Sequence, residues 1–155
     1  MVDARPAHLD GPTTVPSDAR VPARAVALVL EPHPEGGWYR RTWASPASLE
    51  TANGTGPAAT MILFLLPPGE ASAWHVVASD ELWLWHGPDP VELELGGAGA
   101  RPAPEERIVL GPERPQGLVP AGVWQRTLPS DGEALVSCVV SPGFDFADFA
   151  LAEDD

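Results

Sequence analysis

The chain has 155 residues and a formal charge of −13, because 22 Asp and Glu outnumber nine Lys and Arg. This length is typical of one domain with its own hydrophobic core. The negative charge repels phosphate backbones and anionic lipid surfaces, so we expect neither nucleic acid nor membrane as a partner. A single cysteine, Cys138, excludes a disulfide framework and a thiolate zinc cluster, and its apolar surroundings predict a buried side chain.

Residues 1–18 mix Pro, Asp, Gly and Thr without apolar periodicity, which predicts a flexible tail. Ser17 or Asp18 could cap a short helix that continues toward Leu30 and ends at the Glu31-Pro32 junction. No stretch resembles a signal peptide, and no apolar run reaches the length of a membrane span. We therefore expect a cytoplasmic protein with one domain over residues 19–151 and a frayed acidic tail over 152–155.

After Gly36-Gly37 the chain changes to short runs of β-forming residues separated by Pro- and Gly-rich turn signals. Ten runs of this kind predict an all-β antiparallel barrel or sandwich. The run MILFLL is apolar on both faces and belongs in the middle of a sheet. The ten runs occupy residues 38–45, 60–66, 72–77, 81–86, 91–95, 107–110, 116–120, 123–128, 134–141 and 146–151.

The run ELWLWH contains the first candidate site. Period-two geometry places Glu81, Trp83 and Trp85 on one strand face and Leu82, Leu84 and His86 on the other. A carboxylate beside two indoles favours a pocket wall, since small-molecule sites are mostly aromatic cavities with a few polar groups. The alternative is a plain barrel core with a hydrated Glu81 at its end.

His75 lies on the preceding run, and a turn through Ala78 and Ser79 could bring it beside Glu81. An imidazole next to a carboxylate can form a metal ligand pair, or a general base whose pKa is raised by its neighbour. A satisfied core histidine is the simpler alternative.

The stretch EPHPEGGWYRR at 31–41 predicts an irregular loop followed by a strand. In that strand Trp38 and Arg40 share one face, and Tyr39 and Arg41 share the other. One arginine could bind a carboxylate or phosphate through its planar guanidinium, although a surface salt bridge is the common alternative. His33 is expected to orient its Pro-rich loop.

Two further stretches could contribute side chains to the same interior. In GLVPAGVWQ at 117–125, a turn leads into a strand from which Gln125 emerges. In SPGFDFADFAL at 141–151, Asp145 and Asp148 lie among phenylalanines, and one carboxylate could point toward His75. Alternatively, both carboxylates cap turns through side-chain to backbone hydrogen bonds.

These stretches, in this order, resemble the cupin superfamily, and more closely its branch known as cupin_5 or DUF985. The similar region runs from residue 28 to 151 and includes LEPHPEGGWYRRTW, TMILFLLPPGEASAWHVVASDELWLWHG, GLVPAGVWQ and CVVSPGFDFADFAL. The resemblance implies a jelly-roll barrel, the cupin double-stranded β-helix, which is usually assembled as a homodimer. It implies the fold firmly and assigns no reaction.

The superfamily's metal motifs are incomplete in this chain. Val77 and Gln125 stand where metal-binding members place histidines, so the resemblance leaves His75, Glu81 and Gln125 as a reduced ligand set. An amide oxygen is a poor replacement for imidazole nitrogen, so we expect no cofactor, or at most a weakly bound divalent metal. The motif positions that do match are Gly69, His75, Glu81, Gly87, Pro120 and Gly122.

We therefore expect a metal-independent cupin enzyme of the isomerase, epimerase or cyclase type that binds a small molecule. His75 would act as acid and base, Glu81 would orient it, and further residues would contact the substrate. One alternative is a metal-dependent cupin such as a dioxygenase, and another is a ligand-binding module without catalysis. The expected substrate-binding residues are Trp83, Trp85, Gln125, Arg40, Trp38 and Asp145.

Overall fold

The structure is a computed structural model that describes residues 21–153. The expected tail over residues 1–18, the cap residues Ser17 and Asp18, and the last two residues of the chain lie outside the described residues. No helix within residues 21–153 is long and apolar enough to cross a membrane.

Within the described residues, short strands follow one short helix. The elements in chain order are α1 (Ala23–Ala27), β1 (Glu31–Pro32), β2 (Trp38–Ala44), β3 (Ser48–Thr51), β4 (Gly54–Pro57), β5 (Thr60–Leu66), β6 (His75–Val77), β7 (Asp80–Pro88), β8 (Val91–Leu95), β9 (Glu106–Leu110), β10 (Gln116–Val119), β11 (Gln125–Thr127), β12 (Ala134–Ser141), the 3₁₀ turn η1 (Phe146–Asp148) and β13 (Phe149–Leu151). Each of the ten predicted runs overlaps one of these strands, so the all-β prediction is confirmed.

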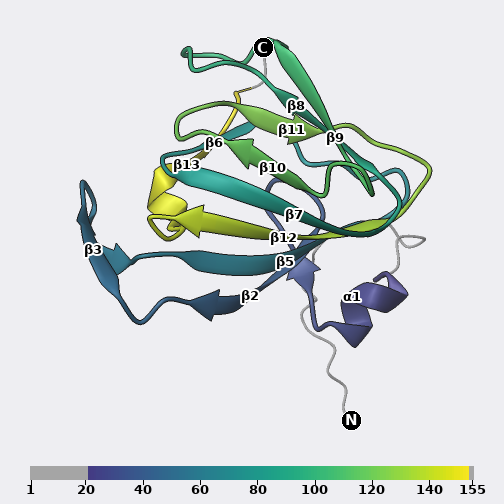
Figure 1. Cartoon of the computed structure of the whole chain (residues 1–155), viewed down its shortest axis with the longest axis horizontal. Helices are drawn as coiled ribbons and strands as arrows, with labels where there is room; N and C mark the ends of the chain where they lie inside the picture. Colours follow the sequence, from purple (N-terminus) through teal and green to yellow (C-terminus); the bar gives the residue numbers. More distant parts are fainter. Residues whose placement is uncertain (1–20, 154–155) are drawn as a thin grey trace.

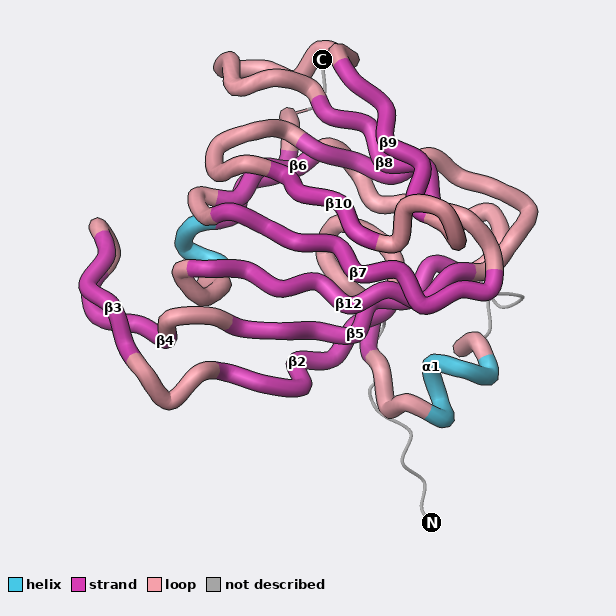
Figure 2. The backbone as a smooth tube through the Cα atoms, in the orientation of Figure 1, coloured by secondary structure: helices cyan, strands magenta, loops and turns pink. Residues whose placement is uncertain are grey.

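Two antiparallel sheets form the jelly-roll barrel (Figure 1). The larger sheet has the strand order β1-β2-β5-β12-β7-β10, and the smaller has β13-β6-β11-β8-β9. The strands β3 and β4 form a separate hairpin that extends away from the barrel (Figure 2). As predicted from MILFLL, β5 lies inside the larger sheet, paired with β2 on one side and β12 on the other.

The alternation of β5 fills two hydrophobic clusters on opposite faces of the larger sheet. Phe64 and Leu66 belong to the main core between the sheets, together with Trp83. Leu65 points the other way and packs with Ala25 of α1 in a second, smaller cluster. A strand with apolar residues on both faces is stable here because α1 covers the outer face.

The helix is shorter than the sequence predicts and ends at Ala27. Backbone hydrogen bonds from Val29 N to Val26 O and from Leu30 N to Ala25 O close its last turn in the Schellman pattern. This pattern requires a left-handed residue, and Val29 supplies it with φ 59°. The helix therefore stops before the Glu31-Pro32 junction.

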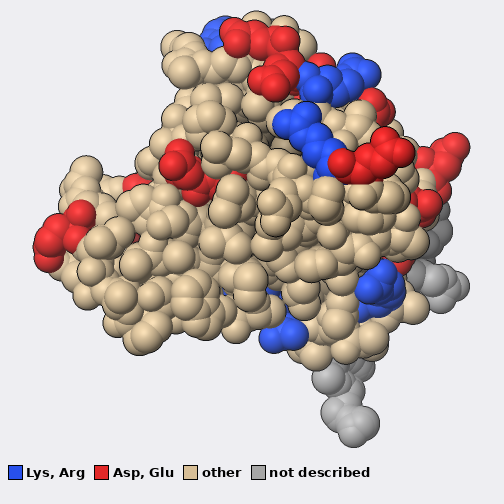
Figure 3. Space-filling view, in the orientation of Figure 1, with Lys and Arg blue, Asp and Glu red and all other residues tan. Residues whose placement is uncertain are grey.

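Acidic and basic side chains occur together on the surface of the barrel. On the face shown in Figure 3, most of the charged side chains lie at the end formed by β8 and β9. There Arg126 contacts Glu94 at 2.7 Å, and Arg107 contacts Glu92 at 3.4 Å. This end of the molecule therefore presents mixed charges.

Candidate active site

A cavity of about 460 Å³ lies inside the barrel. Its floor is buried and carries polar side chains, whereas the residues at its mouth are exposed. We use "floor" for Glu35, His75, Glu81 and Cys138, and "mouth" for Glu31, Arg41, Asp145 and Phe146; the remaining lining residues are His33, Tyr39, Pro57, Thr60, Ile62, Phe64, Val77, Val140 and Phe144.

Glu35 reaches the cavity on a tight turn between β1 and β2. The turn is closed by hydrogen bonds from His33 N to Gly37 O and from Gly36 N to His33 O. Gly36 and Gly37 have φ of 108° and 79°, in the left-handed region that favours glycine. A Cβ on Gly36 would lie 2.3 Å from Ala71 O, and a Cβ on Gly37 would lie 2.7 Å from the Phe64 ring. The Gly-Gly pair is therefore required for the turn to enter the barrel.

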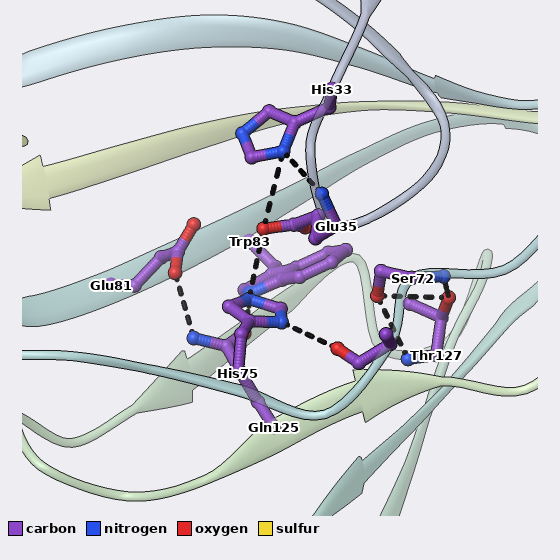
Figure 4. A network of polar contacts seen from close by, with 9 residues as sticks. His33, Glu35, Ser72, His75, Glu81, Trp83, Gln125 and Thr127 are labelled. Atoms are coloured by element: carbon purple, nitrogen blue, oxygen red, sulfur yellow. Dashed lines mark hydrogen bonds and ion pairs between the residues drawn. The ribbon is translucent and has the colours of Figure 1, made fainter. Parts of the chain in front are cut away.

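Three contacts join Glu35 and His75 into a closed ring, and Figure 4 shows the one between their side chains. Ala73 N donates to Glu35 O at 2.7 Å, and Ala73 O lies 2.8 Å from His75 Nδ1. The third contact joins His75 Nε2 and Glu35 Oε1 at 3.2 Å. Because a carbonyl can only accept, Nδ1 of His75 carries a proton, and Nε2 of the neutral ring is an acceptor. The ring of contacts thus fixes both the orientation and the tautomer of His75.

Burial decides the charge of this pair. Desolvation raises the pKa of Glu35 well above its ordinary value, and the nearby Glu81 carboxylate raises it further. Desolvation also lowers the pKa of His75 to about 4, against a smaller opposing effect of the hydrogen bond to Ala73. Both shifts favour the neutral forms. Near neutral pH a protonated Glu35 therefore donates its hydrogen bond to Nε2 of His75.

Glu81 is held on the other side of the floor by a separate hydrogen-bonded chain. Trp83 Nε1 donates to Gln125 Oε1 at 3.0 Å, and Gln125 Nε2 donates to Glu81 Oε1 at 2.8 Å. Burial raises the pKa of Glu81 to about 7, although hydrogen bonds from Gln125 and Cys138 oppose that shift. Glu81 is thus the floor group whose charge changes near neutral pH.

The structure corrects the predicted partnership between His75 and Glu81. Both side chains line the cavity, as expected, but the carboxylate in contact with His75 belongs to Glu35. The predicted direction of the pKa shift is also wrong, because desolvation lowers the pKa of His75 more than any neighbour raises it. Glu81 instead accepts a hydrogen bond from Gln125.

The predicted tryptophan lining is a second correction. Trp83 is fully buried in the main core, where its ring meets Phe64 edge-on at 6.0 Å. Trp85 packs against the same core and donates from Nε1 to Asp89 O, next to a register shift in the pairing of β7 with β12. Neither residue lines the cavity. Its aromatic wall consists of Tyr39, Phe64, Phe144 and Phe146.

The predicted face of β2 is the third correction. Trp38 packs in the cluster under α1, and Arg40 Nε donates to Leu28 O at 2.9 Å. The cavity is lined by the other pair on this strand, Tyr39 and Arg41. Strand alternation separated the two pairs correctly but could not tell which face α1 would cover.

Three other expectations are met in the structure, and one is corrected. Asp145 lines the cavity mouth, and it also caps η1 by accepting from Ala147 N at 2.9 Å. His33 orients its loop, because its Nδ1 accepts from Glu35 N at 3.1 Å. Cys138 is buried, as its apolar run predicts, although it also lines the cavity. The predicted contact of Gln125 with the substrate is the fourth correction, because Gln125 is buried behind Glu81 and does not line the cavity.

Glu35 is the main residue that strand patterns missed. Its position in a loop gives no periodic signal, and the loop enters the barrel only because of the following glycines. The available signal was the pair Gly36-Gly37, which indicates a backbone that must approach other atoms closely.

The reduced ligand set His75, Glu81 and Gln125 does not fit a divalent metal. The only oxygen of the Gln125 side chain already accepts from Trp83, and its amide nitrogen, which is no metal ligand, faces Glu81. Among residues 21–153, no group of three or more His, Cys, Asp or Glu is arranged to hold a metal ion. The side chains present suit proton transfer better than metal coordination.

Comparisons with known proteins agree with this fold. The family model described as "Cupin superfamily (DUF985)" matches residues 24–152. A hypothetical protein from Leishmania major is 33% identical, with a TM-score of 0.72, and the match covers 81% of this chain and 83% of that one. A protein from Shewanella oneidensis is also 33% identical, with a TM-score of 0.71 and coverage of 83% and 81%.

A more distant structure shares the fold alone. A dTDP sugar isomerase from Desulfovibrio desulfuricans is 13% identical, with a TM-score of 0.52, and the match covers 76% of this chain and 85% of that one. No protein of curated function matches this chain. The family match spans most of the chain and agrees with the barrel described above. The chain therefore belongs to the cupin superfamily, in the family described as DUF985.

Proposed function

We propose that the protein is a metal-independent enzyme that moves a proton on a small molecule bound in the cavity, in a reaction of the isomerase or epimerase type. One observation carries this proposal: the contact of 3.2 Å between His75 Nε2 and Glu35 Oε1 lies in a cavity that also presents Glu81. These groups form two separately held acid/base sites. His75 keeps its expected part in acid/base chemistry, as the partner of Glu35.

The two carboxyl groups differ in the way that such a reaction requires. Burial raises the pKa of Glu81 to about 7, so a substantial fraction is ionised near neutral pH and can accept a proton. Desolvation raises the pKa of Glu35 well above its ordinary value, and the Glu81 carboxylate raises it further, so Glu35 keeps its proton when Glu81 is ionised. Two carboxyl groups of which one keeps its proton while the other is ionised are suited to act as acid and base in one reaction.

The proposed step is balanced without a co-reactant. Glu81 takes a proton from a carbon next to a carbonyl group, and the electrons of that C–H bond form an enol. The Glu35 carboxyl gives the proton that it otherwise donates to Nε2 of His75 to the carbonyl oxygen as the charge develops. The resulting carboxylate has no hydrogen bond to Nε2 until it takes a proton back. In the second half of the reaction Glu35 takes back a hydroxyl proton from the enol. Delivery of a proton from solvent to the other face of the carbon, with loss of the Glu81 proton to solvent, gives an epimer. Delivery of the Glu81 proton to the neighbouring carbon gives an isomer.

The test is deuterium exchange from D₂O into a panel of carbonyl compounds, including aldoses, ketoses and keto acids, followed by NMR. We expect exchange by the native protein that falls by roughly 10²–10⁴-fold in Glu81→Gln and in Glu35→Gln, because each variant removes one acid/base group. The amide introduced by Glu35→Gln retains a donor for His75, so the geometry of the pair is preserved in that variant.

His86→Gln is the matched control for His75→Gln. His86 is exposed, and its ring contacts Ser137 Oγ at 2.7 Å, away from the cavity lining. We expect His75→Gln to lower exchange and His86→Gln to leave it unchanged. Compounds that bind without exchanging would support the alternative of a binding module, and equal exchange by native protein and Glu81→Gln would refute the proposed base.

A further inference from the structure

The mouth of the cavity carries three charged side chains that do not neutralise one another. Glu31, Arg41 and Asp145 all line the cavity and are exposed. Among residues 21–153, Arg41 forms no ion pair with either carboxylate. A protein with a charge of −13 thus keeps one guanidinium at the entrance to its acid/base site.

Arg41 is held in place but retains free donors. Its Nη2 donates to Phe144 O at 2.9 Å, which joins β2 to the segment before η1. A guanidinium has five N–H donors, so one hydrogen bond leaves most of them for a ligand. Tyr39 lies two residues earlier on the same strand face and lines the same cavity, so its hydroxyl adds another donor near Arg41.

Flat rings surround these charges. Phe144 and Phe146 meet edge-on with 4.8 Å between ring centroids, and Phe146 meets Phe149 in the same way at 5.7 Å. Phe146 is 47% exposed despite its size. The His33 ring continues this group, since it lies 4.5 Å from the Tyr39 ring and 6.0 Å from the Phe146 ring. An exposed aromatic wall of this kind offers a stacking surface to a ring-shaped ligand.

From these features we infer that the cavity takes a cyclic polyhydroxylated molecule with one anionic group, such as a sugar that carries a carboxylate or a phosphate. This inference rests on the proposed function and names its substrate class; the ring-opened form of such a sugar supplies the carbonyl group that the proposed step requires. The anionic group binds Arg41, hydroxyl groups donate to Glu31 and Asp145, and the apolar face of the ring packs on Phe146. This arrangement directs the rest of the ring toward Glu81 and Glu35.

A cation is the main alternative to an acidic sugar at this mouth. Aromatic rings and two carboxylates would also suit a cation, through cation–π and ionic contacts. A cation at this position would lie next to Arg41, whereas an acidic sugar satisfies the guanidinium and donates hydroxyl protons to both carboxylates. Charge-assisted hydrogen bonds to a guanidinium are among the stronger polar contacts. The anionic sugar therefore complements all three charged groups.

A matched set of hexoses tests the inference by calorimetry. Glucuronate, glucose and glucosamine present a carboxylate, a neutral ring and an ammonium group, and glucose 6-phosphate presents a phosphate. We expect both acidic sugars to bind more tightly than glucose, and glucosamine to bind most weakly. In Arg41→Gln the affinity for the acidic sugars should fall by about tenfold or more, while that for glucose changes little.

Arg40→Gln is the matched control, because it removes the same charge from the opposite face of β2 and leaves the cavity unchanged. Equal losses in the two arginine variants would reduce the effect to overall charge and overturn the inference. Tightest binding of glucosamine, strengthened in Arg41→Gln, would assign the cavity to a cation and also overturn it. Failure of both acidic sugars to bind at millimolar concentration would do the same.

The proposed function can fail separately from this inference. If Arg41 determines acidic-sugar binding but Glu81→Gln leaves deuterium exchange intact, the ligand class is correct and the proposed reaction is wrong. If exchange depends on Glu81 but binding does not depend on Arg41, the reaction stands and the ligand class is wrong.

Discussion

The two faces of the larger sheet differ in what they bury. Its outer face, under α1, packs Leu65 with Ala25, Leu30 and Leu135. The buried polar Ser137, two residues from Leu135 on the same face of β12, is uncharged and contacts His86. The inner face contributes Glu81 to the cavity floor, beside a buried glutamine and a buried indole. Apolar burial stabilises the fold, whereas a buried ionisable group costs stability unless it remains neutral or hydrogen-bonded. Packing on the outer face thus stabilises the fold, whereas burial of Glu81 on the inner face lowers the stability and shifts the pKa of its carboxyl group.

Gly36→Ala should have the largest effect, because it disturbs the turn that brings Glu35 to the inner face. Its Cβ would lie 2.3 Å from Ala71 O, and its φ of 108° strains any L residue. We expect the free energy of unfolding to fall by about 2–6 kcal/mol. Chemical denaturation measures this loss.

Gly122→Ala is its control. Gly122 also has a positive φ, of 78°, but a Cβ there would meet no atom within 4 Å. This variant should show the backbone strain alone, with a loss of about 1–2 kcal/mol. Equal losses in the two alanine variants would contradict the close approach of Gly36 to Ala71.

Leu65→Ala tests the outer face. Leu65 is fully buried, so its truncation should lower the free energy of unfolding by about 2–5 kcal/mol. Because its side chain points away from the cavity, the pKa of Glu81 measured by NMR should stay unchanged. A shifted Glu81 pKa in this variant would show that the two faces are not independent.

Glu81→Gln tests how much stability the protein loses, as the pH rises, by burying an ionisable group on the inner face. Burial raises the pKa of Glu81 from 4.5 in the unfolded chain to about 7 in the folded protein. The folded protein therefore binds this proton more tightly, which stabilises it at low pH, and this stabilisation is lost as the pH rises from 4.5 to 7. Relative to Glu81→Gln, the native protein should lose up to about 3 kcal/mol of stability from pH 4.5 to 7.

The native protein has to be compared with Glu81→Gln because the buried histidines change the stability in the opposite direction with pH. Burial lowers the pKa of His75 and of His33 to about 4 each, so their contribution is lost as pH falls from 6.5 toward 4. Glu81→Gln cancels these shared terms. A difference in unfolding free energy that stays constant with pH would contradict the raised pKa of Glu81.

Val29→Gly should give the smallest effect, a gain of about 0.5–1 kcal/mol. Val29 closes α1 in the left-handed region and is 72% exposed, so glycine relieves strain without losing buried area. Val26→Gly, in the body of the same helix, should instead destabilise the protein. Thermal unfolding of the two variants measures the sign, and destabilisation by Val29→Gly would contradict the Schellman closure.

The strands could be predicted from the sequence because each has its own local signal. Apolar and aromatic runs between Pro- and Gly-rich turns found ten of the 13 strands in residues 21–153. Strand alternation placed Leu82 and His86 on the face of β7 opposite Glu81, and both are exposed in the structure. The short strands β1, β3 and β4 carry exposed or half-buried residues and give a weaker signal.

The site was only partly predictable because its geometry depends on tertiary structure. His75 and Glu81 were placed in the cavity correctly, since both occupy inward positions of strands. The partner Glu35 comes from a loop, and the face of β2 that lines the cavity depends on where α1 packs. The tryptophans of β7 were correctly expected on the core side, but a core position and a cavity position look alike in a strand pattern.

The most direct measurement is an NMR titration of the side-chain ¹³C and ¹⁵N signals of Glu35, His75 and Glu81, assigned with Glu35→Gln, His75→Gln and Glu81→Gln. The arrangement described here predicts that at pH 7 Glu35 is protonated and His75 is neutral with its proton on Nδ1, while Glu81 titrates at about 7. An imidazolium at His75 beside an ionised Glu35 at pH 7, with Glu81 titrating near its ordinary value of 4.5, would contradict the proposed acid/base pair.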